Sequence, residues 1–143
     1  MGGVSGYYIS NDLSLLDLSF IFNFLTLESH WGKGKTLDEV RESIQHSVCF
    51  GLYDLKNSQK GFGKVVLRDN QSGYIMDVFI SKDVRGMGLG KMLMEGILNC
   101  QKLSHIPIWE LKSRDAQEFY KKLGFLEVPD ESGLLRKEIS VST

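Results

Sequence analysis

The chain has 143 residues, 42% of them hydrophobic and 24% charged, and its 17 basic and 18 acidic side chains leave a net charge of −1. That length and composition predict a globular domain with a sizeable core, and the near-neutral charge offers no overall attraction to nucleic acid or to an anionic membrane. No apolar run approaches the roughly 20 residues that a membrane-spanning helix needs. The two cysteines, Cys49 and Cys100, suggest neither a disulfide framework nor a metal cluster. We therefore expect a reduced, cytoplasmic protein with no metal ion and with neither nucleic acid nor membrane as a partner.

One domain is expected over residues 6–143, after a flexible start at residues 1–5. The first residues have neither the charged nor the apolar region of a secretory signal. No repeat, low-complexity tract or proline-rich linker divides the rest of the chain.

A strand and a strongly apolar helix are predicted first. Residues 7–10 favour a strand, and Asn11 or Asp12 is expected to cap the helix that follows. That helix is unusually apolar between Phe20 and Leu27. Its apolar face is expected to pack against a sheet, and part of it could instead wall an apolar substrate pocket.

A basic loop and a second helix come next. Residues 31–35 read Trp-Gly-Lys-Gly-Lys, and Thr36 with Glu39 forms the capping box of a helix that runs to about Gln45. Trp31 has two open interpretations, a contact to the substrate or a half-buried anchor for the loop.

Three consecutive strands are predicted over residues 48–55, 61–68 and 74–80, and their short turns indicate an antiparallel meander. Cys49 lies in the first of them without a neighbouring base, so we expect a core cysteine and not a nucleophile.

Asp77 is a carboxylate in the otherwise apolar third strand, where burial is costly unless the group is hydrogen-bonded or functional. Strand alternation turns Asp77 away from a face that carries Tyr74, Met76 and Val78. A structural hydrogen bond to a loop is therefore expected more than catalysis.

The most informative stretch is Arg-Gly-Met-Gly-Leu-Gly-Lys at residues 85–91, which leads from the third strand into a helix. Alternating glycines at a helix N-terminus expose backbone N–H groups at the positive end of the helix dipole, an arrangement that binds phosphate. The spacing fits a dinucleotide fingerprint poorly and lacks the P-loop pattern.

The C-terminal part predicts a strand over residues 106–111, a helix from Ala116 to about Leu123 capped by residues 113–115, and a hairpin of strands at 125–128 and 134–139. The element order is β-α-α-β-β-β-α-β-α-β-β, which predicts an α/β (α+β) fold. It is built on one mixed, mostly antiparallel sheet with helices on both faces. Edge strands near the C-terminus leave room for a homodimer.

Two motifs carry a family resemblance. Residues 85–90, after an apolar strand, resemble the pyrophosphate loop of the GCN5-related N-acetyltransferases (GNAT). The phrase Ala-Gln-Glu-Phe-Tyr-Lys-Lys-Leu-Gly-Phe at 116–125 is similar to the helix that follows at the expected distance in that family. The resemblance implies an acyl-CoA N-acyltransferase-like fold and the use of acetyl-CoA. It also implies acetyl transfer to a primary amine of a small molecule or peptide by direct attack in a ternary complex.

The resemblance also implies roles for particular residues. The pyrophosphate is expected to be held by Arg85, Gly86, Met87, Gly88, Leu89, Gly90 and Lys91. The thioester carbonyl is expected to meet a backbone N–H near Phe79 or Ile80, and Ser113 the pantetheine arm. Tyr120 is expected to border the cofactor and to protonate the leaving thiolate, although packing alone could explain it.

The base and the acceptor are less defined. Asp77 and Glu110 are the candidate bases, and a water chain is the alternative to both. Phe24, Trp31 and Met76 are expected to line a site for an amine on an apolar body. A non-catalytic acyl-CoA-binding or sensing module on the same fold is the rival hypothesis, and a nucleotide-binding domain is a third one.

Overall fold

The computed structural model describes residues 4–28, 34–69 and 71–140. A seven-stranded sheet in the order β1-β2-β3-β4-β5-β7-β6 runs through the molecule. Neighbouring strands are antiparallel except for β4 and β5, which are parallel. The strands are β1 (Tyr7–Ser10), β2 (Val48–Asp54), β3 (Gln59–Arg68), β4 (Ser72–Ile80), β5 (Ile108–Lys112), β6 (Leu126–Glu127) and β7 (Leu134–Glu138). The predicted mixed sheet and the predicted element order are confirmed.

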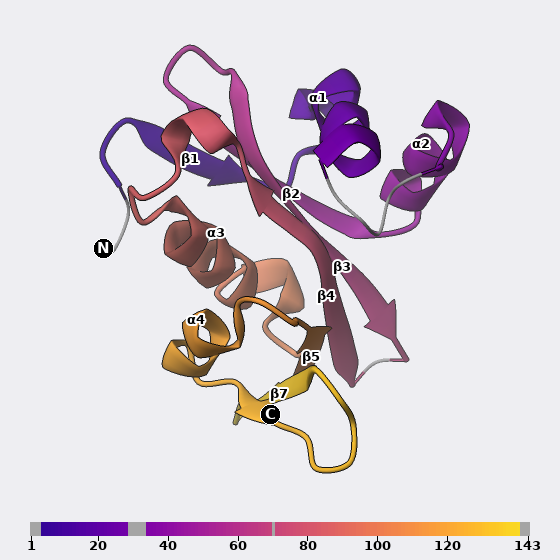
Figure 1. Ribbon diagram of the computed structural model, residues 1–143, viewed down its shortest axis with the longest axis vertical. Helices are drawn as coiled ribbons and strands as arrows, with labels where there is room; N and C mark the ends of the chain where they lie inside the picture. The colour runs from indigo at the N-terminus through magenta and orange to yellow at the C-terminus, as the bar shows by residue number, and fades with distance from the viewer. Residues whose placement is uncertain (1–3, 29–33, 70, 141–143) are drawn as a thin grey trace.

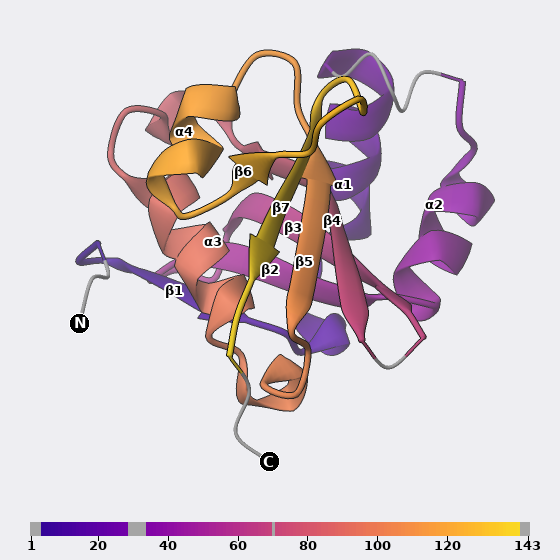
Figure 2. The same ribbon diagram turned by 90° about the horizontal axis from the view of Figure 1, so that it is seen from below.

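One pair of helices covers each face of the sheet (Figures 1 and 2). The helices are α1 (Leu18–Asn23), α2 (Leu37–Gln45), α3 (Leu89–Leu98) and α4 (Gln117–Lys122). The pair α1 and α2 lies on one face, and the pair α3 and α4 lies on the other. Among the described residues, no helix is long and apolar enough to cross a membrane.

The first helix begins later than the sequence predicts. Asp12 accepts a hydrogen bond from Ser14 N at 2.9 Å and caps only a 3-10 turn, Leu13–Leu15. The cap of α1 is Asp17, whose N–H donates to Gln59 Oε1 of β3 at 2.7 Å. The prediction of a cap at Asn11 or Asp12 is therefore wrong, because α1 begins only at Leu18, where the Asp17 side chain accepts from Phe20 N at 3.1 Å. The helix then continues into a single π-helical turn, Phe24–Glu28.

The second helix follows its local signal. Glu39 N donates to Thr36 Oγ1 at 3.1 Å, and Thr36 N donates to Glu39 Oε1 at 2.8 Å. This reciprocal pair is the predicted capping box, and it satisfies donors at the start of α2 without tertiary help.

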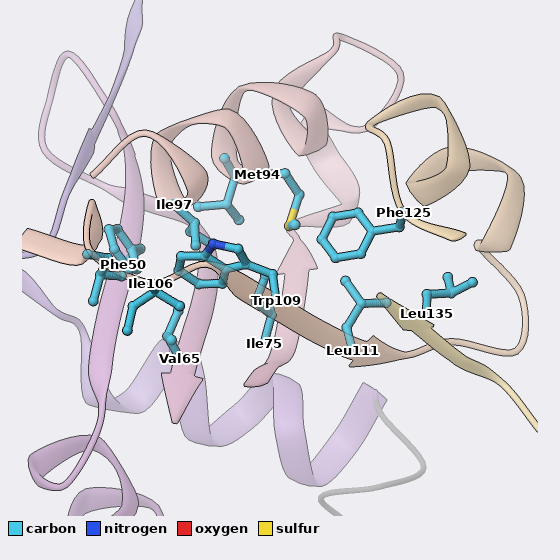
Figure 3. Close-up of a cluster of buried hydrophobic side chains, with 12 residues drawn as sticks. Phe50, Val65, Ile75, Met94, Ile97, Ile106, Trp109, Leu111, Phe125 and Leu135 are labelled. Atoms are coloured by element: carbon cyan, nitrogen blue, oxygen red, sulfur yellow. The ribbon is translucent and has the colours of Figure 1, made fainter. Parts of the chain in front are cut away.

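The main core lies between the sheet and α3. Trp109 of β5 is buried at its centre, with Met94 and Ile97 of α3 on the helix side and Phe125 beyond them (Figure 3). A second cluster joins α1 and α2 to the opposite face of the sheet. Its buried members are Ile21, Phe24, Leu25, Val40, Ile44, Cys49, Phe62 and Phe79.

The strand β4 carries one extra residue relative to β3. Phe62 pairs with Phe79, whereas Lys64 pairs with Met76, so Asp77 and Val78 together oppose Gly63. Asp77 has φ +57°, a left-handed conformation that aspartate tolerates better than most residues. This is a β-bulge, and it overturns the expected alternation along the strand. Val78 packs on the α3 side, whereas Asp77 reaches toward α2.

Part of the N-terminal segment is packed. Val4 donates its N–H to Met92 Sδ at 3.4 Å, and its side chain joins a small cluster with Leu52, Val84 and Leu89. The domain start at residue 6 stays a prediction, and residues 1–3 lie outside the described part of the chain.

The close contact of β4 with β5 provides a test of this packing. A Cβ added to Gly73 would lie 2.9 Å from Trp109 Cζ3 and 3.2 Å from Val65 Cγ1. Replacing Gly73 with alanine should therefore lower the free energy of unfolding by about 1–3 kcal/mol, the usual cost of overpacking. Urea unfolding measures this change, and the m-value should stay that of the wild type. A wild-type midpoint would mean that Trp109 shifts freely and that the close contact is not a constraint.

Candidate active site

The site is built around a strand that loses one neighbour. The register of β4 with β5 runs from Ser72 opposite Ile108 to Ile75 opposite Leu111. Beyond that point β4 continues to Ile80 against β3, while β5 ends at Lys112. In Figure 1, β4 extends past β5 toward the loop that precedes α3. Backbone groups on this edge of β4 are thus available to a ligand instead of a strand.

The direction of each amide follows from the hydrogen bonds at the end of β4. Ser81 N donates to Lys60 O of β3 at 2.7 Å. Because successive residues of a strand present their N–H and C=O groups to opposite edges, those of Ile80 face away from β3. Arg85 Nε donates to Ile80 O at 3.0 Å on that edge. Of the two amides named from the sequence, that of Ile80 therefore faces the open edge, whereas that of Phe79 faces Phe62 of β3.

Val78 is the backbone position that sequence reasoning missed. It follows the bulge, lies two residues before Ile80, and packs its side chain on the same α3 side of the sheet. Its amide is therefore turned the same way as that of Ile80. No local pattern in the sequence signals this, because the orientation depends on the extra residue at Asp77.

The glycine loop lies where β4 ends. Gly86 and Gly88 have φ +82° and +84°, and Gly88 is the N-cap of α3. A Cβ on Gly86 would meet nothing within 4 Å, and one on Gly88 would meet only Val4 Cγ2 at 3.8 Å. The loop therefore presents bare backbone to open space.

The start of α3 supplies the amides of this loop. Met92 N donates to Gly88 O at 3.2 Å and closes the first turn. The amides of Leu89, Gly90 and Lys91 precede that bond, as first-turn amides of an α-helix do. The Leu89 side chain is 1% exposed and anchors the turn in the core, while Met87 and Lys91 are exposed.

Helix α4 borders the same loop. A Cβ on Gly90 would lie 3.5 Å from Phe119 Cζ, so α4 packs directly on the first turn of α3. The half-buried Tyr120 ring packs edge-on against Phe119 and Phe125, and burial raises the pKa of its hydroxyl. Ser113 Oγ accepts from Ala116 N at 3.0 Å, so Ser113 orders the first turn of the helix, whose N-cap is Ala116.

The two candidate bases are both paired. Asp77 Oδ2 lies 3.1 Å from Lys64 Nζ, and both side chains are buried. Glu110 of β5 accepts from Arg136 Nε at 2.8 Å and lies 3.4 Å from Arg68 Nη1. The ion pair gives Asp77 a structural contact, as the sequence favoured over catalysis, but its partner lies in β3 and not in a loop as expected.

The expected acceptor residues are only partly brought together. The Phe24 ring stacks on Phe79 with centroids 3.8 Å apart and is 8% exposed, so it belongs to the second core cluster. Met76 is half-buried on β4 at the bulge. Trp31 lies outside the described residues.

Comparison with known proteins gives consistent family matches. A family model described as an acetyltransferase (GNAT) domain matches residues 45–127. The uncharacterized N-acetyltransferase ycf52 of Porphyra purpurea is 30% identical over 105 residues, which are 70% of this chain and 60% of that protein. The chain thus spans less than two thirds of the length of this relative.

Solved structures extend the similarity over nearly the whole chain. A Xanthomonas campestris pv. campestris protein assigned to the GNAT family is 31% identical, with a TM-score of 0.82 over 89% of both chains. A GNAT family acetyltransferase from Elizabethkingia anophelis, solved with acetyl-CoA bound, is 13% identical. It shares the fold with a TM-score of 0.71 over 95% of this chain and 100% of that one.

The environment of Cys49 gives a test of the site's electrostatics. Burial raises the pKa of the Cys49 thiol to about 12, and Lys64 opposes this only in part. Because the thiolate is the reactive form, Cys49 should resist a disulfide reagent at pH 8 in the folded protein. Titration with such a reagent should find only the half-buried Cys100 reacting fast in the native state, and both thiols after denaturation. Two fast native thiols would contradict the burial of Cys49.

Proposed function

Because the chain belongs to the GNAT acetyltransferase family, we propose that it is an acetyl-CoA-dependent N-acetyltransferase. Its acceptor is a primary amine of a small molecule or peptide, which attacks the thioester directly in a ternary complex. One observation carries the proposal. The glycine loop that presents bare amides at the start of α3 adjoins the open edge of β4.

The loop fits the pyrophosphate of acetyl-CoA. Two positive-φ glycines, Gly86 and Gly88, leave a space that a side chain would fill, and the first-turn amides lie at the positive end of the α3 dipole. Arg85 and Lys91 add positive charge beside it. The net charge of −1 makes this local arrangement the source of anion affinity.

The thioester of acetyl-CoA supplies an acyl group that an amine can attack. The amides of Ile80 and Val78 are the donors that we assign to its carbonyl oxygen, since both face the open edge of β4. Donors fixed in a strand need no reorganisation when negative charge develops on that oxygen, which is why such donors lower the barrier.

Tyr120 is the proposed proton donor to the departing thiolate. Its raised pKa keeps the phenol protonated through neutral and moderately alkaline pH. The edge-on contacts of its ring with Phe119 and Phe125 hold it beside the loop. Ser113 keeps its assignment at the pantetheine arm, beside the start of α4.

Removal of the ammonium proton is assigned to a water chain. Asp77 is held by Lys64 beneath α2, and Glu110 accepts from Arg136, so each carboxylate already has a cationic partner. The acceptor amine is placed on the α1 and α2 side of the sheet near Met76, with an apolar body against the end of α1.

Thiol release from acetyl-CoA across a panel of primary amines separates the enzyme from the rival binding module. The enzyme releases CoA thiol at a rate that depends on both the amine and its concentration. Saturable CoA binding with no amine-dependent release would support the module, and tighter binding of NAD or ATP than of CoA would support a nucleotide-binding domain.

Removal of the Tyr120 hydroxyl tests the proton donor. Tyr120→Phe should lower kcat by about 10²–10⁴-fold, because general-acid assistance has that size, and should leave acetyl-CoA affinity close to wild type. Because burial raises the pKa of Tyr120, wild-type activity should not fall through ionisation of this hydroxyl until the pH exceeds the ordinary range of a tyrosine. Equal rates for wild type and Tyr120→Phe from neutral to alkaline pH would remove Tyr120 from the mechanism.

The loop itself is tested by graded substitution at Gly88. At φ +84° any L-residue is strained, and a β-branched one is strained most. CoA affinity measured by calorimetry should therefore fall from wild type to Gly88→Ala and fall further in Gly88→Val, while circular dichroism confirms that both variants are folded. Wild-type affinity in Gly88→Val would show that the pyrophosphate lies elsewhere.

A further inference from the structure

A buried ion pair lies at the bulge of β4. Lys64 Nζ of β3 lies 3.1 Å from Asp77 Oδ2, and the two side chains are only 5% and 2% exposed. The same ammonium donates to Ser43 Oγ of α2. Together the three side chains connect α2, β3 and β4 at the place where the ladder between β3 and β4 is irregular.

Burying this ion pair in the core costs free energy. Desolvating two charges cancels most of their attraction, and apolar side chains of similar volume often give equal or greater stability. The second oxygen of Asp77 has no hydrogen-bond partner among the described residues, and the adjoining cavity has about 10 Å³, room for one water molecule. Stability alone therefore explains the pair poorly.

The position of the pair suggests what it does. The extra residue at Asp77 changes which edge of the sheet each later residue of β4 faces, because a one-residue slip reverses every group beyond it. With the bulge in place, Ile80 presents its amide to the open edge. Without it, the pairing of Lys64 with Met76 would continue in register and turn that amide toward β3.

We propose that Lys64 and Asp77 are positioning residues that hold the β4 bulge so that the amides of Val78 and Ile80 face the thioester carbonyl of bound acetyl-CoA. The left-handed backbone of Asp77 is strained even for aspartate. The contact of its carboxylate with Lys64, which Ser43 holds in turn, offsets that strain and fixes the extra residue at this position. The inference rests on the proposed function, since it concerns the acyl group of the proposed cofactor.

The decisive variant is Lys64→Met, which removes the ammonium and keeps an unbranched apolar side chain. The matched control is Lys60→Met, because Lys60 joins the same strand to Asp83 through an ion pair of 2.9 Å at the surface, with Asp83 57% exposed. Acetyl-CoA labelled with ¹³C at the thioester carbonyl reports the hydrogen bond directly, since the carbonyl resonance moves downfield when its oxygen accepts one. Calorimetry with CoA reports the pyrophosphate loop separately.

We expect the bound carbonyl resonance to be downfield in wild type and in Lys60→Met, and to return toward its free position in Lys64→Met. CoA itself should bind all three proteins alike. The preference of Lys64→Met for acetyl-CoA over CoA should fall by roughly 2- to 10-fold, the worth of one hydrogen bond. A full downfield shift in Lys64→Met, or an equal loss of the shift in Lys60→Met, would overturn the proposal.

A milder variant covers the case in which Lys64→Met does not fold. Ser43→Ala removes the α2 contact of the ammonium within a helix that favours alanine. This variant should lose part of the carbonyl shift, and an unchanged shift would count against the proposal.

If wild type binds no CoA, the proposed function fails. The bulge is then tested in the ligand-free protein by the amide resonances of Val78 and Ile80. These should move in the Lys64 or Ser43 variant and stay in place in Lys60→Met, and unmoved resonances in the former would refute the proposal.

Discussion

A strand that is paired along its full length on one side and along only part of it on the other is the constraint on which this structure depends. Backbone amides inside a sheet are normally hydrogen-bonded to neighbouring strands, and unpaired amides cost free energy when buried. Here β4 pairs with β3 as far as its last residue, Ile80, but pairs with β5 only as far as Ile75. On the rest of that edge a ligand can hydrogen-bond to the backbone groups of β4 in place of a strand. The loop to α3 begins where this edge ends.

The two faces of the sheet carry separate core clusters. Trp109, Phe125 and the apolar side of α3 make a tightly packed core under the glycine loop. Leu89 ties the first turn of α3 into a neighbouring cluster. The loop can therefore be bare of side chains and still be fixed. On the other face, the cluster around Phe24 and Phe79 holds α1 and α2 against the sheet. The proposed cofactor side and the proposed acceptor side are thus built on separate core clusters.

In the proposed function, anion affinity depends on backbone geometry more than on charge. The chain carries nearly equal numbers of acidic and basic side chains, and several of the basic ones are engaged elsewhere, as Lys64 is with Asp77 and Arg136 is with Glu110. The proposed short-range site is instead the positive end of α3 with its two left-handed glycines. Such a site selects a group that can approach closely, which a diffuse basic patch would not do.

The sequence by itself determined those features whose causes lie within a few residues. The glycine loop, the capping box of Thr36 and Glu39, the aromatic pair on α4 and the order of strands and helices are all local patterns, and each appears where the pattern predicts it. The family resemblance rests on the same local motifs, which is why the mixed sheet could be predicted from them.

Only the tertiary structure decided the rest, because the causes are contacts between distant residues. The backbone N–H of Asp17 donates to Gln59 Oε1 of β3, a long-range contact that no pattern near Asp17 reveals. The strand β7 enters the sheet between β5 and β6 through pairing on both of its edges. The alternation that put Val78 on one face with Tyr74 and Met76 was wrong, because one extra residue in β4 is accommodated opposite Gly63 and Val78 packs toward α3. That residue sets which amides face the open edge, and its place is visible only when β3, β4 and α2 are seen together.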